Sequence, residues 1–149
     1  MLTINMMRKL TIYAMMLLVS AIGVGAQSAH TPEKGSPERK AILDALRILV
    51  EKELKQKIVF VTDNFKVQGT WAFISGTPQT PDGSRPDYRK TIYWEAVKSD
   101  AFDNNFFALL RRTTGKWRVV TKAIGCTDVC YADWWRTHKA PKAIFPYTE

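Results

Sequence analysis

The stretch SPERKAILDALRILVEKEL, residues 36–54, predicts a long amphipathic helix and decides the fold of the chain. Ser36 can cap a helix start, Pro37 suits the first helical position, and Glu38 lies where the helix dipole favours an acid. Apolar residues recur at spacings of three and four and form one face: Ile42, Ala45, Leu46, Leu49, Val50 and Leu54. Because charged residues occupy much of the remaining surface, this apolar face must pack against a hydrophobic partner.

The partner that the sequence offers is a β-sheet. Residues 57–61 (KIVFV) are β-branched and aromatic, and the turn signal TDN follows them, which predicts a first short strand. Residues 65–75 (FKVQGTWAFIS) predict two short strands about Gly69, or one strand that is bulged there. Residues 106–124 (FFALLRRTTGKWRVVTKAI) predict a hairpin that turns at 113–116.

Strict alternation in the second strand of that hairpin would divide its residues between two faces. The two sets are Trp117, Val119, Thr121 and Ala123 on one face, and Arg118, Val120, Lys122 and Ile124 on the other. Neither set is purely polar. One face can therefore carry the helix, while the other lines a shallow groove or a dimer contact.

The connection between the two strand groups has two predicted parts. Residues 77–90 (TPQTPDGSRPDYRK) contain three prolines and a glycine, and a loop of this length in a small domain tends to be functional or mobile. Residues 91–102 (TIYWEAVKSDAF) predict a short helix with Ile92, Ala96 and Val97 turned inward.

The last predicted element is a helix from about Asp128 to His138, capped by Thr127 and stopped by Pro141. A long helix that leads into a curved antiparallel sheet, with short helices beside it, defines an α+β fold. Residues 36–149 are expected to form this single domain. By analogy at the level of the fold, the order of elements resembles an α+β roll of the cystatin or NTF2-like kind.

The first residues predict export. Arg8 and Lys9 precede an apolar run that ends in small residues, which is the pattern of a secretory signal peptide over residues 1–26. A membrane anchor is the alternative, but the run is shorter than the roughly 20 residues that span a bilayer. We therefore expect a flexible leader at 27–35 and a periplasmic or secreted mature protein that does not span the membrane.

The charge of the chain favours anionic partners. The 149 residues carry a formal net charge of +8 at pH 7, and residues 1–26 hold two of the positive charges and no acid, so the remainder carries +6. This surplus is dispersed, without a run of Lys or Arg. It favours acidic glycans or a lipid surface, whereas an exported protein that lacks a basic stripe is not expected to bind nucleic acid.

The chain holds two cysteines, both in GCTDVCYADWW at 125–135. In an oxidising compartment, Cys126 and Cys130 are expected to form a disulfide if their Cα atoms come within about 7 Å. A redox site is a weaker alternative, because the spacing is C-x-x-x-C and not C-x-x-C. The third alternative is a copper site of Cys126, Cys130 and His138, but such a site needs a further soft ligand such as Met, and every Met lies in the signal segment. We expect no metal or other cofactor.

The sequence gives little support to catalysis. It contains no G-x-S-x-G elbow, no H-E-x-x-H and no Gly-rich phosphate loop. His30 falls in the leader, which leaves His138 as the one histidine of the domain. A carboxylate pair such as Asp63 with Glu95 or Asp103 could act in the cavity of a roll fold. For each acid alone, a solvated surface or a helix cap is the simpler role.

Aromatic residues are abundant in the domain. Adjacent Trp134 and Trp135 cannot share one face of a helix, because successive residues are about 100° apart, so one of them should lie near the surface. Exposed tyrosine and tryptophan beside basic residues would form a surface for an anionic, glycan or protein partner. We therefore predict Tyr88, Arg89, Trp94 and Trp135 as surface binding residues.

Four stretches carry a resemblance to a family of small, uncharacterised, secreted bacterial proteins. They are PERKAILDALR (37–47), FKVQGTWAF (65–73), ALLRRTTGKWRVV (108–120) and IGCTDVCYADW (124–134). That family has no established activity, so the resemblance implies no catalytic residues. It also implies that the cysteine pair is a local addition and not the site around which the family is built.

The sequence thus favours an exported, non-enzymatic binding protein of the bacterial envelope. Its partner would be an envelope protein or an anionic or glycan ligand, and a homodimer through the sheet is a further option. One alternative is a small periplasmic enzyme that uses a cavity carboxylate, and the other is a copper- or thiol-handling protein. A deep pocket with converging polar groups would favour the enzyme, whereas a flat, aromatic-rich sheet face would favour the binding protein.

Overall fold

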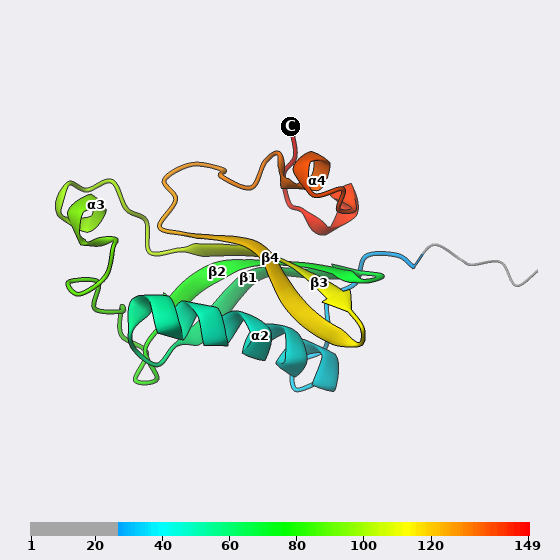
Figure 1. The fold of residues 1–149 in the computed structure, drawn as a ribbon, viewed down its shortest axis with the longest axis horizontal. Coiled ribbons are helices and arrows are strands. Elements are labelled where there is room, and N and C mark those ends of the chain that lie inside the picture. The colour runs from blue at the N-terminus through cyan, green and yellow to red at the C-terminus, as the bar shows by residue number, and fades with distance from the viewer. Residues whose placement is uncertain (1–26) are drawn as a thin grey trace, which may run out of the picture.

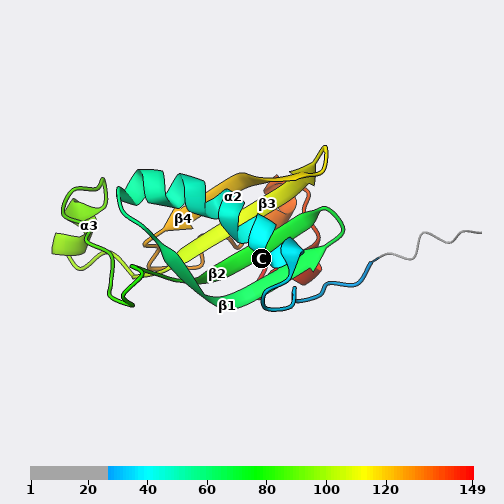
Figure 2. The same ribbon diagram turned by 90° about the horizontal axis from the view of Figure 1, so that it is seen from below.

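The computed structural model describes residues 27–149, so the predicted signal peptide lies outside the described residues. Figure 1 shows one antiparallel sheet with a long helix on one face and the C-terminal segment on the other. In chain order the elements are α2 (Pro37–Leu54), β1 (Val59–Gln68), β2 (Trp71–Gln79), α3 (Trp94–Lys98), β3 (Phe106–Thr113), β4 (Lys116–Ile124), α4 (Trp134–Thr137) and the 3-10 helix η2 (Lys142–Ile144). The sheet has the order β1-β2-β3-β4, visible in Figure 2, and the α+β class is confirmed.

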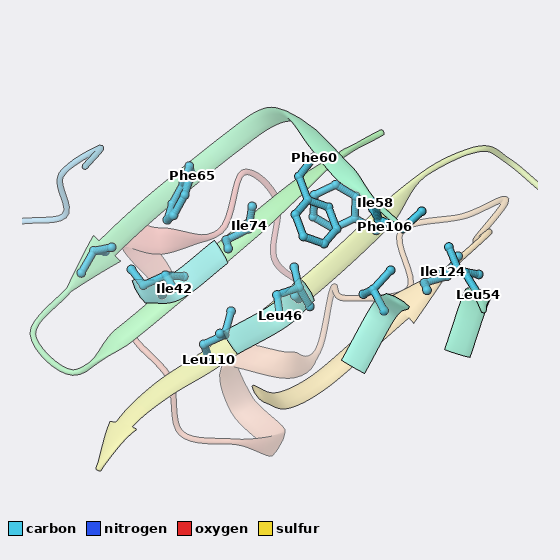
Figure 3. Close-up of a cluster of buried hydrophobic side chains, with 14 of the residues drawn as sticks. Ile42, Leu46, Leu54, Ile58, Phe60, Phe65, Ile74, Phe106, Leu110 and Ile124 are labelled. Atoms are coloured by element: carbon cyan, nitrogen blue, oxygen red, sulfur yellow. The ribbon is translucent and has the colours of Figure 1, made fainter. Parts of the chain in front are cut away.

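Helix α2 begins and packs as its sequence predicts. The Ser36 side chain accepts a hydrogen bond from the Arg39 backbone amide at 3.2 Å, and the helix ends where Lys55 adopts a left-handed conformation with φ 58°. Four residues of the predicted apolar face are buried: Ile42, Leu46, Val50 and Leu54. They pack on the sheet side chains that Figure 3 draws, whereas Leu49, predicted to share this face, is 41% exposed. The helix and one face of the sheet therefore enclose the main core.

Strand β1 runs straight through the TDN segment, where the sequence predicts a turn. The strand continues because Asp63 forms a bulge: Thr62 lies opposite Gly76, and Asn64 lies opposite Ser75 on β2. The bulge changes which residues face the helix, so that Phe60 before it and Phe65 after it both enter the same core. At the other end of β1, the chain turns between Gln68 and Trp71, so the prediction of two strands about Gly69 is confirmed and a single bulged strand is not formed.

The predicted hairpin of β3 and β4 is confirmed, but the expected alternation along β4 fails in the middle. Thr114 and Gly115 have φ values of 48° and 76°, as a tight two-residue hairpin turn requires. Leu110 is opposite Val119 whereas Leu109 is opposite Thr121, so Val120 is an extra residue. Because of this bulge, Trp117 and Val119 contact the same core as Ile124.

The second face of the sheet is covered by the C-terminal segment, so it is neither an open groove nor an exposed dimer surface. Tyr131, Trp134, Ile144 and Phe145 pack there on a cluster that includes Phe73. The predicted helix from Asp128 to His138 shrinks to the single turn of α4. Short turns replace its first half, since the Cys130 amide bonds to the Asp128 carbonyl at 2.9 Å and Asp128 Oδ1 accepts from the Val129 amide.

The leader and the long loop are both tied to the domain. His30 exchanges two backbone hydrogen bonds with Val67 of β1, at 2.9 and 2.8 Å, where the sequence predicts a flexible leader. In the loop, Gln56 holds both backbone groups of Asp87, each at 2.9 Å. Of the residues expected to turn inward near α3, Ala96 and Val97 are half-buried against the core, but Ile92 is 81% exposed, so that expectation is wrong for Ile92.

Candidate functional site

Tyr88 does not lie at the surface, so its assignment as a surface binding residue is wrong. Its side chain is 3% exposed and packs on Phe102, with ring centroids 4.6 Å apart. Its hydroxyl donates to Asn104 Oδ1 at 2.5 Å. Burial raises the pKa of Tyr88 to about 12, and the charge of Arg85 opposes this rise only in part. The apolar ring anchors the long loop in the core, where it cannot meet a ligand.

The other three predicted binding residues lie apart from one another. Arg89 is exposed, but it holds Asp87 through several hydrogen bonds, and this contact lowers the pKa of Asp87 to about 2. Trp94 is half-buried in α3, with the Lys98 ammonium 5.9 Å from its ring centroid. Trp135 is half-buried in the C-terminal segment, in a part of the fold remote from α3 (Figure 1).

The adjacent tryptophans divide as the sequence predicts. Trp134 is 8% exposed and packs edge-on against Phe73 at 6.5 Å, whereas Trp135 remains half-buried. The Trp135 indole N–H donates to the Glu149 carbonyl at 3.0 Å, and the Lys142 ammonium lies 3.7 Å from its ring centroid. Trp135 is therefore occupied by its own segment and is not an open aromatic platform.

The acids proposed for catalysis are not brought together in a cavity. Asp63 is on the β1 bulge, Glu95 forms an ion pair with Lys98 in α3, and Asp103 follows in the connection to β3. All three are exposed. Sequence reasoning missed a different acid, Glu53 of α2.

Glu53 forms a half-buried polar cluster with two groups from distant parts of the chain. Its carboxylate accepts from the Tyr93 hydroxyl and is ion-paired with Lys122 of β4. The Glu53 and Lys122 side chains are 24% and 19% exposed. Burial, with the hydrogen bond to Glu53, raises the pKa of Tyr93. All three polar groups are engaged with one another, which is the arrangement of a structural clamp and not of an unoccupied catalytic site.

Cys126 and Cys130 are joined in a disulfide, with their Cα atoms 6.3 Å apart. Neither sulfur is then a thiolate, which is the form that binds metal or attacks another disulfide. Within residues 27–149, no group of three His, Cys, Asp or Glu side chains is arranged to hold a metal ion. His138 ends α4 and is half-buried. The Cys126–Cys130 disulfide closes the short loop between β4 and the C-terminal segment, and it restrains the chain where this segment begins.

A basic surface at the free end of the sheet is the candidate site. We call it the basic hairpin, and it consists of Arg111, Arg112, Lys116 and Arg118 on β3 and β4 with Trp71 and Trp117 beside them. The two-residue turn fixes the register, so that Arg111 is directly opposite Arg118 and Arg112 is opposite Trp117. All four basic residues are exposed. Pairing of the two strands thus brings together four positive charges that are spread over residues 111–118 in the sequence.

Each arginine that adjoins a tryptophan lies over its ring. The Arg111 guanidinium is 5.0 Å from the Trp71 centroid on the face that carries the C-terminal segment, and the Arg112 guanidinium is 5.6 Å from the Trp117 centroid on the helix face. Such stacking limits the motion of a planar guanidinium while leaving its N–H groups available. The basic hairpin therefore presents preorganised hydrogen-bond donors on both of its faces.

No acidic side chain within residues 27–149 is ion-paired with the basic hairpin. Among residues 27–149, none of the side-chain ion pairs includes any of its four basic residues. Glu38, which lines a cavity of about 370 Å³ together with Arg112, is bonded to His30 at 2.9 Å. Uncompensated like charges on adjacent strands repel each other, and an anionic ligand would relieve that repulsion.

A second, larger cavity of about 530 Å³ lies between the leader and the β1 bulge. The Arg39 guanidinium in this cavity is already engaged by protein groups. It donates to the Pro32 carbonyl at 3.2 Å and to Thr62 Oγ1 at 2.8 Å, and it lies 4.6 Å from the Phe65 ring centroid. Arg39 therefore holds the leader against β1. This cavity offers a ligand fewer uncommitted donors than the basic hairpin does.

One signal in the sequence could have located the basic hairpin. Once the turn is placed at 113–116, pairing along LLRRTTGKWR puts Arg111 opposite Arg118 by counting alone. The position of Trp71 beside Arg111 requires the β2–β3 register, which the sequence does not provide.

Comparison with known proteins gives no match to a family model, to a curated protein or to a solved structure.

Proposed function

We propose that this chain is an exported, non-enzymatic binding protein of the bacterial envelope, and that it contacts an anionic envelope component through the basic hairpin. One observation carries the proposal: four exposed basic side chains without ion-pair partners among residues 27–149 gather at one end of the sheet, and two of them are stacked on tryptophan. A rigid, unpaired basic surface attracts and orients an anionic partner.

Export is the expected setting for this activity. The pattern of residues 1–26 favours a signal peptide, and the Cys126–Cys130 disulfide is compatible with an oxidising compartment. Among residues 27–149, no helix is long and apolar enough to cross a membrane. A periplasmic or secreted location would place the basic hairpin among the acidic polymers and lipids of the envelope.

The finer class of the fold is part of the same proposal. A long helix followed by a four-stranded antiparallel meander supports a roll of the cystatin or NTF2-like kind. In this chain both sheet faces are covered, one by α2 and the other by the C-terminal segment. Binding would therefore use an end or an edge of the sheet, and a homodimer through an open sheet face is disfavoured.

The test is a charge-matched pair of variants of residues 27–149. One variant carries Arg111→Gln, Arg112→Gln, Lys116→Gln and Arg118→Gln. The control carries Lys34→Gln, Lys52→Gln, Lys90→Gln and Lys139→Gln, which removes the same charge from four other exposed positions. Binding to dextran sulfate, a simple polyanion, is followed by tryptophan fluorescence at two salt concentrations.

We expect the hairpin variant to lose most of its affinity and its salt dependence, while the control keeps at least about half of its affinity. Equal losses in the two variants would mean that only net charge matters and would contradict the proposed surface.

A further inference from the structure

We infer that the ligand of the basic hairpin is an acidic polysaccharide whose sugar carboxylates bind to a row of side chains across the sheet. The inference rests on the proposed function and adds the chemical class of the ligand. The row consists of Gln68, Trp71, Arg111 and Arg118, one residue from each strand, and we call it the cross-sheet row.

The register of the sheet builds this row. Gln68 is opposite Trp71, Trp71 is opposite Arg111, and Arg111 is opposite Arg118. Residues directly opposite in antiparallel strands project to the same face, so the four side chains share the face that carries the C-terminal segment. That segment packs on the middle of the face and leaves Arg111 and Arg118 exposed at its end.

The spacing and the donors of the row suit carboxylates that repeat along a chain. Neighbouring strands are about 4.8 Å apart, so two guanidiniums stand side by side at a separation comparable to the length of one sugar ring. Each guanidinium can bind a carboxylate through two parallel N–H···O bonds. The stacking on Trp71 holds the plane of Arg111 for such a contact. A linear polyuronate offers one carboxylate on each sugar, at a repeat comparable to the strand spacing.

The remainder of the row favours a ligand with hydroxyl groups. The Oε1 atom of Gln68 is buried and has no hydrogen-bond partner among residues 27–149. A buried acceptor without a donor costs free energy, and a ligand hydroxyl that displaced the side chain covering this oxygen would remove that cost. Sugars supply hydroxyl donors beside the carboxylate, whereas the side chain of an acidic peptide supplies the carboxylate alone.

A membrane surface fits the hairpin less well than a soluble chain does. Proteins that dock on bilayers commonly insert large apolar side chains beside their basic residues. The turn of the hairpin is made of Thr114 and Gly115, and the most exposed apolar side chains, Ile92 and Ile48, lie outside the hairpin. On the hairpin itself Val120 is 40% exposed, but it lies at the β4 bulge and not at the turn. Trp71 and Trp117 are half-buried beneath their arginines. The tip of the hairpin therefore lacks a large apolar side chain that could insert into a bilayer.

The test compares three anionic probes by calorimetry on residues 27–149 with the disulfide intact. The probes are oligogalacturonate, poly-L-glutamate of matched charge, and vesicles that contain phosphatidylglycerol. The variants Arg111→Lys and Arg118→Lys keep the positive charge but remove the planar guanidinium that donates two parallel hydrogen bonds. The control Arg136→Lys makes the same change at an arginine 6.0 Å from Trp135, outside the cross-sheet row.

We expect oligogalacturonate to bind at least about tenfold more tightly than poly-L-glutamate, and each row variant to weaken that binding by about tenfold while Arg136→Lys leaves it unchanged. Equal affinity for the two polyanions, or no effect of the row variants, would overturn the inference but leave the proposed function standing. Preferential binding to the vesicles would overturn the inference in favour of a membrane. If none of the probes binds, both the inference and the proposed function fail.

Discussion

Tyr93 donates its hydroxyl hydrogen to the carboxylate of Glu53, and the same carboxylate is ion-paired with Lys122. The contact joins three parts of the chain: the last turn of α2, the segment before α3, and strand β4. The cluster is half-buried, so each charge depends on the other groups for solvation. The long connection between β2 and β3 is therefore fastened by this cluster, by the buried ring of Tyr88 and by the two hydrogen bonds of Gln56 to Asp87.

The first prediction concerns this cluster. We expect Tyr93→Phe to lower the free energy of unfolding by about 1–2 kcal/mol, because a hydrogen bond to a charged acceptor is lost. Glu53→Ala should cost more, about 2–3 kcal/mol, because it leaves Lys122 half-buried without a counter-ion. Urea unfolding measures both, with Tyr147→Phe as the control at a tyrosine that is 50% exposed. A Glu53→Ala protein as stable as the unmodified chain would contradict the proposed clamp.

The second prediction concerns alkaline pH. The pKa of Tyr88 rises from an ordinary value of 10.0 to about 12 in the folded protein, so the fold favours the neutral phenol. This contribution is fully present below pH 10 and is lost as the pH rises toward 12. At about 1.4 kcal/mol for each pKa unit, it amounts to at most about 2–3 kcal/mol.

Unfolding measured between pH 9 and pH 12 tests this prediction. We expect Tyr88→Phe to be less stable than the unmodified chain at neutral pH, because the bond to Asn104 is lost, but to decline less steeply at alkaline pH. Some decline should remain in this variant, since the pKa of Tyr93 is also raised. Parallel curves for the two proteins would refute the assignment to Tyr88.

The sequence was sufficient to predict the elements that depend on local patterns. The Ser36 cap, the apolar periodicity of α2 and the turn at Thr114 and Gly115 each involve residues within a few positions of one another. These features therefore appear in the structure where the sequence places them. The pairing of Arg111 with Arg118 belongs to the same group, because a short hairpin turn determines its own register.

The features that could not be predicted depend on contacts between distant parts of the chain. The bulge at Asp63 converts an apparent turn into a continuous strand, and it needs the pairing with β2. Tyr88 looks like a surface residue in its Pro-rich loop, and only the contact with Phe102 buries it. In the same way, Glu53 is ion-paired with Lys122 only because α2 packs against β4. Tyr88 is therefore buried, although its position in the Pro-rich loop predicted a surface residue.

The third prediction follows from the bulge in β1. Gly76 lies so close to β1 that an added Cβ would overlap the carbonyl oxygen of Val61. Because both strands are fixed by their backbone ladder, we expect Gly76→Ala to cost about 3 kcal/mol or more in thermal unfolding. Gly83→Ala is the control: its φ of 84° also disfavours alanine, but its surroundings are open, so it should cost about 1 kcal/mol. Similar losses in the two variants would contradict the close approach.

The fourth prediction separates the disulfide from the binding surface. The bond between Cys126 and Cys130 closes a loop of very few residues, so it removes little entropy from the unfolded chain. We expect the double variant Cys126→Ala, Cys130→Ala to lose about 2 kcal/mol or less in urea unfolding. The Asn105 side chain, which donates to the Cys126 carbonyl at 2.7 Å, should keep the segment in place without the bond.

Binding to the polyanion should be unchanged in this double variant, because the basic hairpin is built by β3 and β4 and not by the C-terminal segment. Asn105→Ala in the double-variant background should then loosen the segment, which can be followed by faster amide exchange of Tyr131 and Trp134. A variant without the disulfide that folds normally but no longer binds would place the binding site at the cysteines. The segment that holds Cys126 and Cys130 would then replace the basic hairpin as the candidate site.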